Sequence, residues 1–120
     1  MNVAVIGASN KPDRYSYQAV KLLAEMGHKP YPVHPSLAKV DNFTVYKNVS
    51  DVPENVDTVT VYLSARNQAK LFDDIIAKKS ISRVIFNPGA ENPELAERLR
   101  DSGVGVVEAC TLVMLRTDQF

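Results

Sequence analysis

The chain has 120 residues, 45% of them hydrophobic, and 14 basic residues balance 14 acidic ones to a net charge of zero. This length and apolar content predict a single globular domain spanning residues 1–120. The absence of a basic excess argues against a general nucleic-acid binder. No apolar run approaches the roughly 20 residues that a membrane-spanning helix needs.

The start of the chain carries no secretory pattern, because a predicted strand follows Met1 and Asn2 directly. The single cysteine, Cys110, excludes an intrachain disulfide and suits a reducing compartment. We therefore expect a cytoplasmic protein.

The first predicted strand is the continuous apolar run 3–6, which is typical of a strand buried on both faces of a parallel sheet. Gly7 then allows a sharp turn and close approach of a phosphate, because it has no Cβ. A polar stretch leads to a helix predicted over 16–26, which Gly27 caps. A strand, a glycine turn and a helix in this order favour nucleotide binding, since amides at a helix N-terminus point toward an anion.

The second predicted strand is 29–33, although prolines at 30 and 32 suit a central strand poorly. His34 and Pro35 end it. Residues 36–55 are predicted to be irregular, with a short strand at 44–46 and a helical turn capped by Ser50.

The second half of the chain alternates strands and helices. We predict strands at 56–63, 83–86 and 104–107, a helix from the N-cap Ser64 to Lys79, a helix from Asn92 to Gly103, and a short tail strand at 111–115. This alternation predicts an α/β fold: a three-layer, Rossmann-like, doubly wound parallel sheet of about five strands with helices on both faces.

Ligands of such sheets bind beyond the carboxyl ends of the strands. Four loops follow strand ends here: 7–10, 34–35, 63–65 and 87–90. The dinucleotide fingerprint G-x-G-x-x-G is incomplete, because only Gly7 is present. The second strand also ends in His34 and not in the acid that binds a ribose hydroxyl. Both departures weaken an NAD interpretation.

The joint order and spacing of several short motifs resembles the small single-domain CoA-binding proteins, which are similar to the CoA-binding Rossmann domain of the succinyl-CoA synthetase α subunit. The motifs are Gly7-Ala8-Ser9, Pro12, Arg14, Ser16-Tyr17, Pro32-Val33-His34-Pro35 and Asn87-Pro88-Gly89-Ala90-Glu91-Asn92. The resemblance covers residues 2 to about 115.

The resemblance implies a coenzyme A site. The glycine loop would hold phosphate through its amides and the Ser9 hydroxyl, and Arg14 would pair with a phosphate. His34 would hydrogen-bond ribose or phosphate. The full set of predicted contacts is Gly7, Ala8, Ser9, Asn10, Arg14, Tyr17, His34, Pro35, Leu63, Ser64, Asn87, Pro88 and Gly89, with Leu63 and Ser64 flanking the adenine and Pro88 and Gly89 near the pantetheine or the pyrophosphate.

Three functions remain open. The first is a module that binds CoA or an acyl-CoA and catalyses nothing, with no catalytic residue and no metal site, since two histidines and one cysteine lack ligand spacing. The second is a minimal NAD(P)-dependent oxidoreductase. The third is a regulatory scaffold with vestigial nucleotide binding. A protein partner or a homo-oligomer is compatible with each, and Cys110 is either a core residue or a reactive thiol.

Overall fold

A five-stranded sheet forms the centre of the computed structural model, which describes all residues, 1–120. Its strands are β1 (Asn2–Ile6), β2 (Lys29–Val33), β5 (Thr58–Val61), β6 (Arg83–Phe86) and β7 (Gly105–Glu108). The helices are α1 (Tyr15–Glu25), α2 (Leu71–Ala77), α3 (Pro93–Asp101) and α4 (Thr111–Arg116). Short elements fill the connections: β3 (Lys39–Val40), β4 (Phe43–Thr44) and the 3₁₀ turns η1 (Val49–Asp51) and η2 (Ala65–Asn67).

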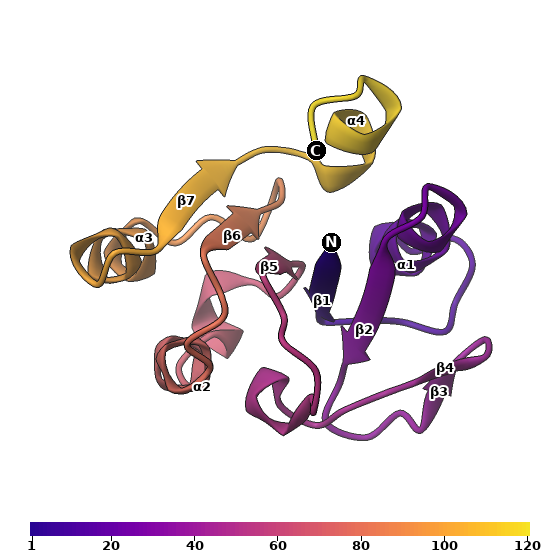
Figure 1. Ribbon diagram of the computed structural model, residues 1–120, viewed down its shortest axis with the longest axis horizontal. Coiled ribbons are helices and arrows are strands. Elements are labelled where there is room, and N and C mark those ends of the chain that lie inside the picture. The colour runs from indigo at the N-terminus through magenta and orange to yellow at the C-terminus, as the bar shows by residue number, and fades with distance from the viewer.

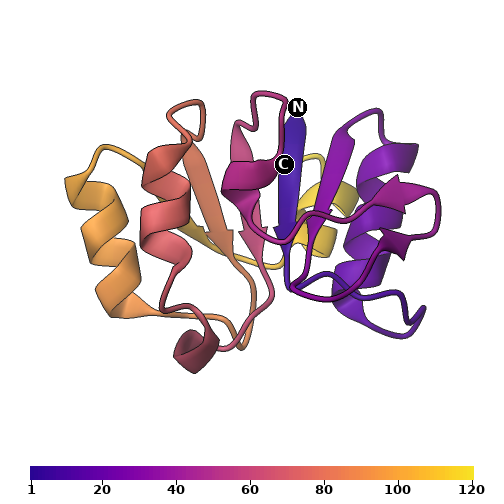
Figure 2. The ribbon, with the colours of Figure 1, turned by 90° about the horizontal axis from the view of Figure 1, so that it is seen from below.

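The strands lie in the order β2-β1-β5-β6-β7, and every neighbouring pair is parallel. The chain passes from β1 to β2 and then returns across β1 to β5, so the direction of winding reverses between β1 and β5. In the register, Ile6 of β1 stands beside both Val33 and Val61. The carboxyl ends of three strands therefore meet at one edge, which faces the bottom of Figure 2. This confirms the predicted Rossmann-like class.

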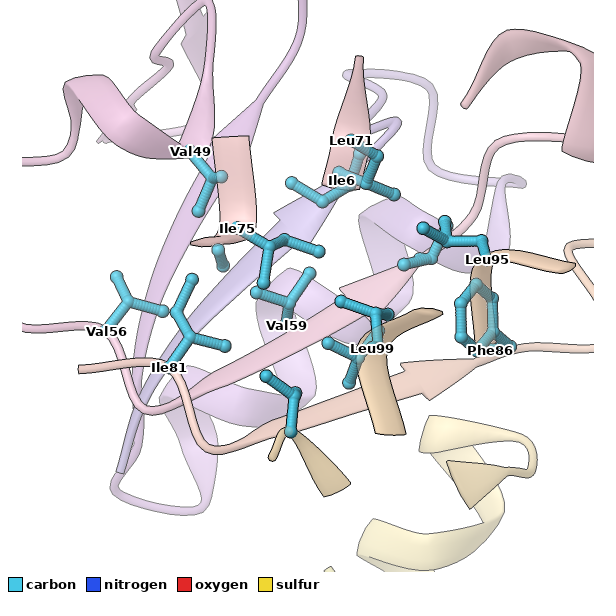
Figure 3. Packing of buried hydrophobic residues seen from close by; sticks show 14 of the residues in the cluster. Ile6, Val49, Val56, Val59, Leu71, Ile75, Ile81, Phe86, Leu95 and Leu99 are labelled. Carbon is cyan, nitrogen blue, oxygen red and sulfur yellow. The ribbon is translucent and has the colours of Figure 1, made fainter. Parts of the chain in front are cut away.

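Helices cover both faces of the sheet, with α2 and α3 on one side and α1 and α4 on the other (Figure 1). Successive residues of β1 point to opposite faces, which explains its unbroken apolar sequence. Ala4 and Ile6 pack in the larger core beneath α2 and α3 (Figure 3). Val3 and Val5 pack in the smaller core beneath α1 and α4.

The prolines of β2 are tolerated because β2 is an edge strand. Beyond it, Tyr46 continues the ladder as a single parallel bridge to Val33, and its N–H donates to the Pro32 carbonyl at 3.0 Å. The region predicted to be irregular contains, besides this bridge, the small antiparallel hairpin of β3 and β4 and the turn η1. The predicted Ser50 cap is wrong, because Ser50 lies inside η1 and the N-cap residue is Asn48.

The predicted helix 64–79 is wrong in its first half, because the segment forms η2 and then a separate helix, α2. The cause is Gln68, whose side chain is 3% exposed. Its Nε2 donates to the carbonyls of Leu63 and Ala90, each at 2.8 Å. These two bonds bring Gln68 between the loops that follow β5 and β6, so the chain turns there and does not continue as one helix.

The predicted tail strand 111–115 is also wrong, because these residues form helix α4. A short apolar run does not distinguish a strand from a buried helix. Three of its apolar side chains, Leu112, Met114 and Leu115, are buried, and Val113 is 53% exposed. The remaining strands and helices agree with the prediction within a few residues at their ends, the largest difference being β5, which covers Thr58–Val61.

Candidate functional site

Gly7 makes the turn at the end of β1 in a conformation that favours glycine, with φ of +81°. A Cβ added at this position would lie 3.1 Å from Leu63 Cδ2 and 3.3 Å from the Leu63 backbone nitrogen. The residue therefore permits both the turn and the close approach of the loop that follows β5. This approach brings together the two strand ends between which the winding reverses.

The amides of Gly7 and Ala8 both donate to the Val33 carbonyl, at 3.1 Å each. We expected these two donors to hold phosphate, and the structure corrects that part of the expectation because both are already used. They join the end of β1 to the end of β2. The amides nearby that have no acceptor within the protein are those of Ser9, Asn10, Asp13, Tyr15, Ser16 and Tyr17.

Helix α1 begins without a side-chain cap, since its N-cap residue is Arg14 and no acid lies in its first turn. The positive end of the helix dipole therefore remains available to an anion. Arg14 and Lys11 add two exposed cations beside it. Ser9 stabilises the approach to the helix, because its Oγ accepts from the Lys11 amide at 3.1 Å.

These groups line one cleft of about 760 Å³, which we call the polar cleft. His34, Leu37, Tyr62 and Leu63 complete its wall. Tyr62 lines the cleft, and its hydroxyl is buried and has no hydrogen-bond partner. That burial raises the pKa of Tyr62 to about 12.

A second cleft of about 270 Å³, which we call the apolar cleft, meets the polar cleft at Gly7, His34 and Leu63. Hydrophobic side chains contributed by several elements form its floor: Ile6, Val33, Val49, Leu63 and Leu71. Pro35, Lys47, Arg66, Lys70 and Asp74 also line it. Burial raises the pKa of the Asp74 carboxyl.

Sequence reasoning missed the cations Lys47, Arg66 and Lys70. They lie in segments after β4 and β5 for which we predicted either irregular structure or a continuous helix. The sequence could have indicated Arg66 and Lys70 as site residues, because both follow the strand that contributes the loop at 63–65.

His34 lies at the junction of the two clefts as predicted, and its Nδ1 accepts from the amides of Ser36 at 3.0 Å and Leu37 at 3.1 Å. Because Nδ1 is the acceptor, the neutral imidazole carries its hydrogen on Nε2. The ring therefore shapes the turn after β2 through one nitrogen and leaves one donor for another partner.

Asn87 is 2% exposed, and its side-chain amide is fully used inside the protein. Nδ2 donates to Thr60 Oγ1 at 2.7 Å and to the Val61 carbonyl at 2.9 Å, while Oδ1 accepts from the Thr111 amide at 2.8 Å. This side chain thus fastens α4 to the sheet. Pro88 and Gly89 are exposed and, like Asn87, line neither cleft. A ligand contact by this loop stays a prediction.

Two further predicted residues lie outside both clefts. Ser64 is exposed, and its Oγ accepts from Asn67 Nδ2 at 3.1 Å. Tyr17 donates to the Asp41 carboxylate, with 3.0 Å to Oδ2, and this hydrogen bond raises the pKa of Tyr17. Ligand contact by either residue also stays a prediction.

Cys110 is half-buried at the N-cap of α4. Its side chain makes no hydrogen bond to the protein, and it lines neither cleft. No cluster of three or more His, Cys, Asp or Glu side chains is arranged to hold a metal ion. None of the helices combines the length and apolar character that a membrane span requires.

Comparison with known proteins relates residues 1–116 to the CoA binding domain family. The alpha subunit of an ADP-forming acetate–CoA ligase from Pyrococcus furiosus is 38% identical over 71 residues, which are 54% of this chain and 15% of that subunit. The chain spans less than a fifth of the length of the acetate–CoA ligases that it matches.

Two further relatives match at closer to their full length. One solved structure, of an uncharacterized protein, has 39% sequence identity and a TM-score of 0.92, and the match covers 99% of this chain and 97% of the other. The uncharacterized protein YneT of Bacillus subtilis is 22% identical over 106 residues, which are 88% of this chain and 77% of YneT. Because the family match extends over almost the whole sequence, the chain belongs to the CoA-binding domain family.

Proposed function

We propose that the protein binds coenzyme A or an acyl-CoA across the two clefts and catalyses no reaction of its own. The observation that carries this proposal is the meeting of the polar and the apolar cleft at Gly7, His34 and Leu63. One cleft offers free amides and cations, and the other offers an apolar floor. A nucleotide needs both kinds of surface side by side.

Each part of the ligand has a suitable partner. The pyrophosphate suits the open N-terminus of α1, where free amides, the helix dipole and Arg14 act together. The adenine suits the hydrophobic floor of the apolar cleft. The ribose between them suits the free Nε2 donor of His34.

The same geometry supports binding without catalysis. A histidine general base must accept a proton through a free ring nitrogen. His34 uses Nδ1 to accept two backbone amides and carries its hydrogen on Nε2, so it has no free acceptor. The related acetate–CoA ligases are named for a CoA reaction, but this chain matches less than a fifth of their length. We therefore extend CoA binding to this chain and not the ligase reaction.

Thermal unfolding in the presence of CoA, acetyl-CoA, NADH, NADPH and ATP tests the proposal. A ligand at about 100 times its dissociation constant adds about 2.7 kcal/mol of apparent stability, which raises the midpoint by several degrees in a domain of this size. We expect such a shift with CoA or acetyl-CoA. A shift with NADPH alone would instead indicate an oxidoreductase, and no shift with any ligand would indicate a scaffold.

A charge variant locates the site. Arg14→Ala should weaken CoA binding about 10- to 100-fold, the range expected for one charge-assisted contact to phosphate. The control is Arg100→Ala, because Arg100 is an exposed cation on α3 that lines neither cleft. Equal CoA affinity in the two variants would contradict the assignment of the phosphate to the N-terminus of α1.

A further inference from the structure

The cations in the two clefts form separate groups on either side of Gly7. Lys11 and Arg14 line the polar cleft with one carboxylate, Asp13. The apolar cleft holds three cations, Lys47, Arg66 and Lys70, against the single carboxylate of Asp74. Both clefts thus carry an excess of positive charge in a chain whose formal net charge is zero.

None of these cations forms a salt bridge within the protein. The one salt bridge in the structure joins Lys21 and Asp41, which lie outside both clefts. The side chains of Arg66 and Lys70 make no hydrogen bond to any protein group, although other long cations do: Arg83 bonds Thr58, and Lys78 bonds the Val52 carbonyl. Unpaired cations around an apolar floor are suited to an anionic group attached to a flat apolar one.

A pyrophosphate at the N-terminus of α1 accounts for the polar cleft only. The second group of cations offers a site for another anion, next to the apolar floor to which the proposed function assigns the adenine. On the basis of the proposed function, we infer that Arg66 and Lys70 recognise a phosphate on the ribose next to the adenine, which in coenzyme A is the 3′-phosphate. These two residues would then select 3′-phosphorylated ligands over dephospho-CoA, ATP and NADH.

The backbone that carries Arg66 is held by buried contacts. Arg66 belongs to η2, and Gln68 ties that turn to the carbonyls of Leu63 and Ala90. The same side chain accepts from Asn92 Nδ2 at 3.0 Å, which connects it to the N-cap of α3. Figure 2 shows this turn at the carboxyl edge of the sheet. A fixed backbone lowers the conformational entropy that is lost when the side chains bind an anion.

Lys47 enters the cleft from the opposite side. It follows Tyr46, which bridges to Val33 beside the end of β2 and accepts from the His34 amide at 2.9 Å. The three cations therefore come from both walls of the apolar cleft. Arg66 and Lys70 are the better pair to test, because their replacement leaves the β2 edge and its bridge intact.

Isothermal titration calorimetry with CoA and dephospho-CoA tests the inference, since the two ligands differ only in the 3′-phosphate. We expect the wild-type protein to bind CoA about 10- to 100-fold more tightly than dephospho-CoA, the difference expected from charge-assisted bonds to one phosphate. The double variant Arg66→Gln/Lys70→Gln should lose most of that preference by weakening CoA binding, with dephospho-CoA affinity almost unchanged. The control Lys79→Gln/Arg100→Gln removes two exposed cations outside the clefts and should keep the preference.

The results that would contradict the inference differ from the one that would contradict the proposed function. Equal affinity of the wild-type protein for CoA and dephospho-CoA would overturn this inference and leave the proposed function intact. Binding of neither ligand would overturn the proposed function. NADPH carries its phosphate at the 2′ position, so binding of NADPH as tight as that of CoA would overturn the assignment to a 3′-phosphate. Loss of preference in the control variant would show that net charge alone sets the affinity, and would also overturn the inference.

Discussion

Replacing Gly7 with alanine should damage both stability and ligand binding. The left-handed φ of +81° costs a residue with a Cβ about 1–2 kcal/mol. The new methyl group would also lie 3.1 Å from Leu63 Cδ2 and 3.3 Å from the Leu63 nitrogen. The side chain can rotate away but the backbone nitrogen cannot, so overpacking adds about 1–2 kcal/mol. We expect Gly7→Ala to lower the free energy of unfolding by about 2–4 kcal/mol.

The matched control is Gly103→Ala. Gly103 has a similar φ of +85°, but no atom beyond the two adjacent residues lies within 4 Å of the position that its Cβ would take. This control should therefore lose only the conformational part, about 1–2 kcal/mol. Urea unfolding gives the two stabilities, and CoA titration at a temperature where both variants are folded gives the affinities. Equal stability losses together with wild-type CoA affinity in Gly7→Ala would refute the argument that Gly7 sets the position of Leu63.

Three other substitutions test the roles assigned here. Asn87→Ala should cost about 2–4 kcal/mol of stability in urea unfolding, because it leaves buried partners such as the Thr111 amide unpaired, while ligand affinity in the folded variant stays near wild type. Burial raises the pKa of Tyr62 to about 12, above the usual value near 10, so the unfolded chain loses this proton first as the pH rises. The free energy of unfolding therefore keeps this contribution in full below about pH 10 and loses about 2–3 kcal/mol of it as the pH rises toward 12. When the free energy of unfolding of Tyr62→Phe is measured against pH, this decrease should be absent. Tyr17→Phe removes an exposed hydrogen bond to Asp41 and should leave the midpoint of thermal unfolding close to that of the wild type; a clear drop in the midpoint would contradict the view that this contact is peripheral.

The sheet was predictable because its strands are short apolar runs that end in turn residues. Val3 to Ile6 followed by Gly7 is such a run, and the alternation of strands with helices required parallel pairing. The junction at Gly7 and His34 was predictable for the same reason, since carboxyl ends of neighbouring parallel strands meet at one edge.

Several of the wrong predictions share a physical cause, which is a tertiary contact that local sequence does not contain. Gln68 breaks the predicted helix only because the Ala90 carbonyl, 22 residues away, lies within hydrogen-bond distance. The amides of Gly7 and Ala8 are occupied because the β2 register brings the Val33 carbonyl to them. The role of Asn87 similarly depends on α4, which we had predicted to be a strand.

The cations of the apolar cleft could not be predicted from sequence motifs. No motif in the sequence marks Arg66 and Lys70 as more than surface residues, and they line the apolar cleft only because η2 and the start of α2 place them beside it. Spacing rules for dinucleotide binding do not cover them, because such rules describe the glycine loop and the end of the second strand.

Mapping CoA-induced changes in the backbone amide NMR spectrum tests the central claim most directly. If CoA binds as proposed, titration should most strongly move the signals of the free amides that line the polar cleft, at Ser9, Asn10, Asp13, Tyr15 and Ser16. The amides of Arg66 and Lys70 should also be affected. The amides of Gly103 and Gly105, remote from both clefts, should remain in place. An unchanged spectrum at saturating CoA, or changes confined to residues outside the two clefts, would contradict the account.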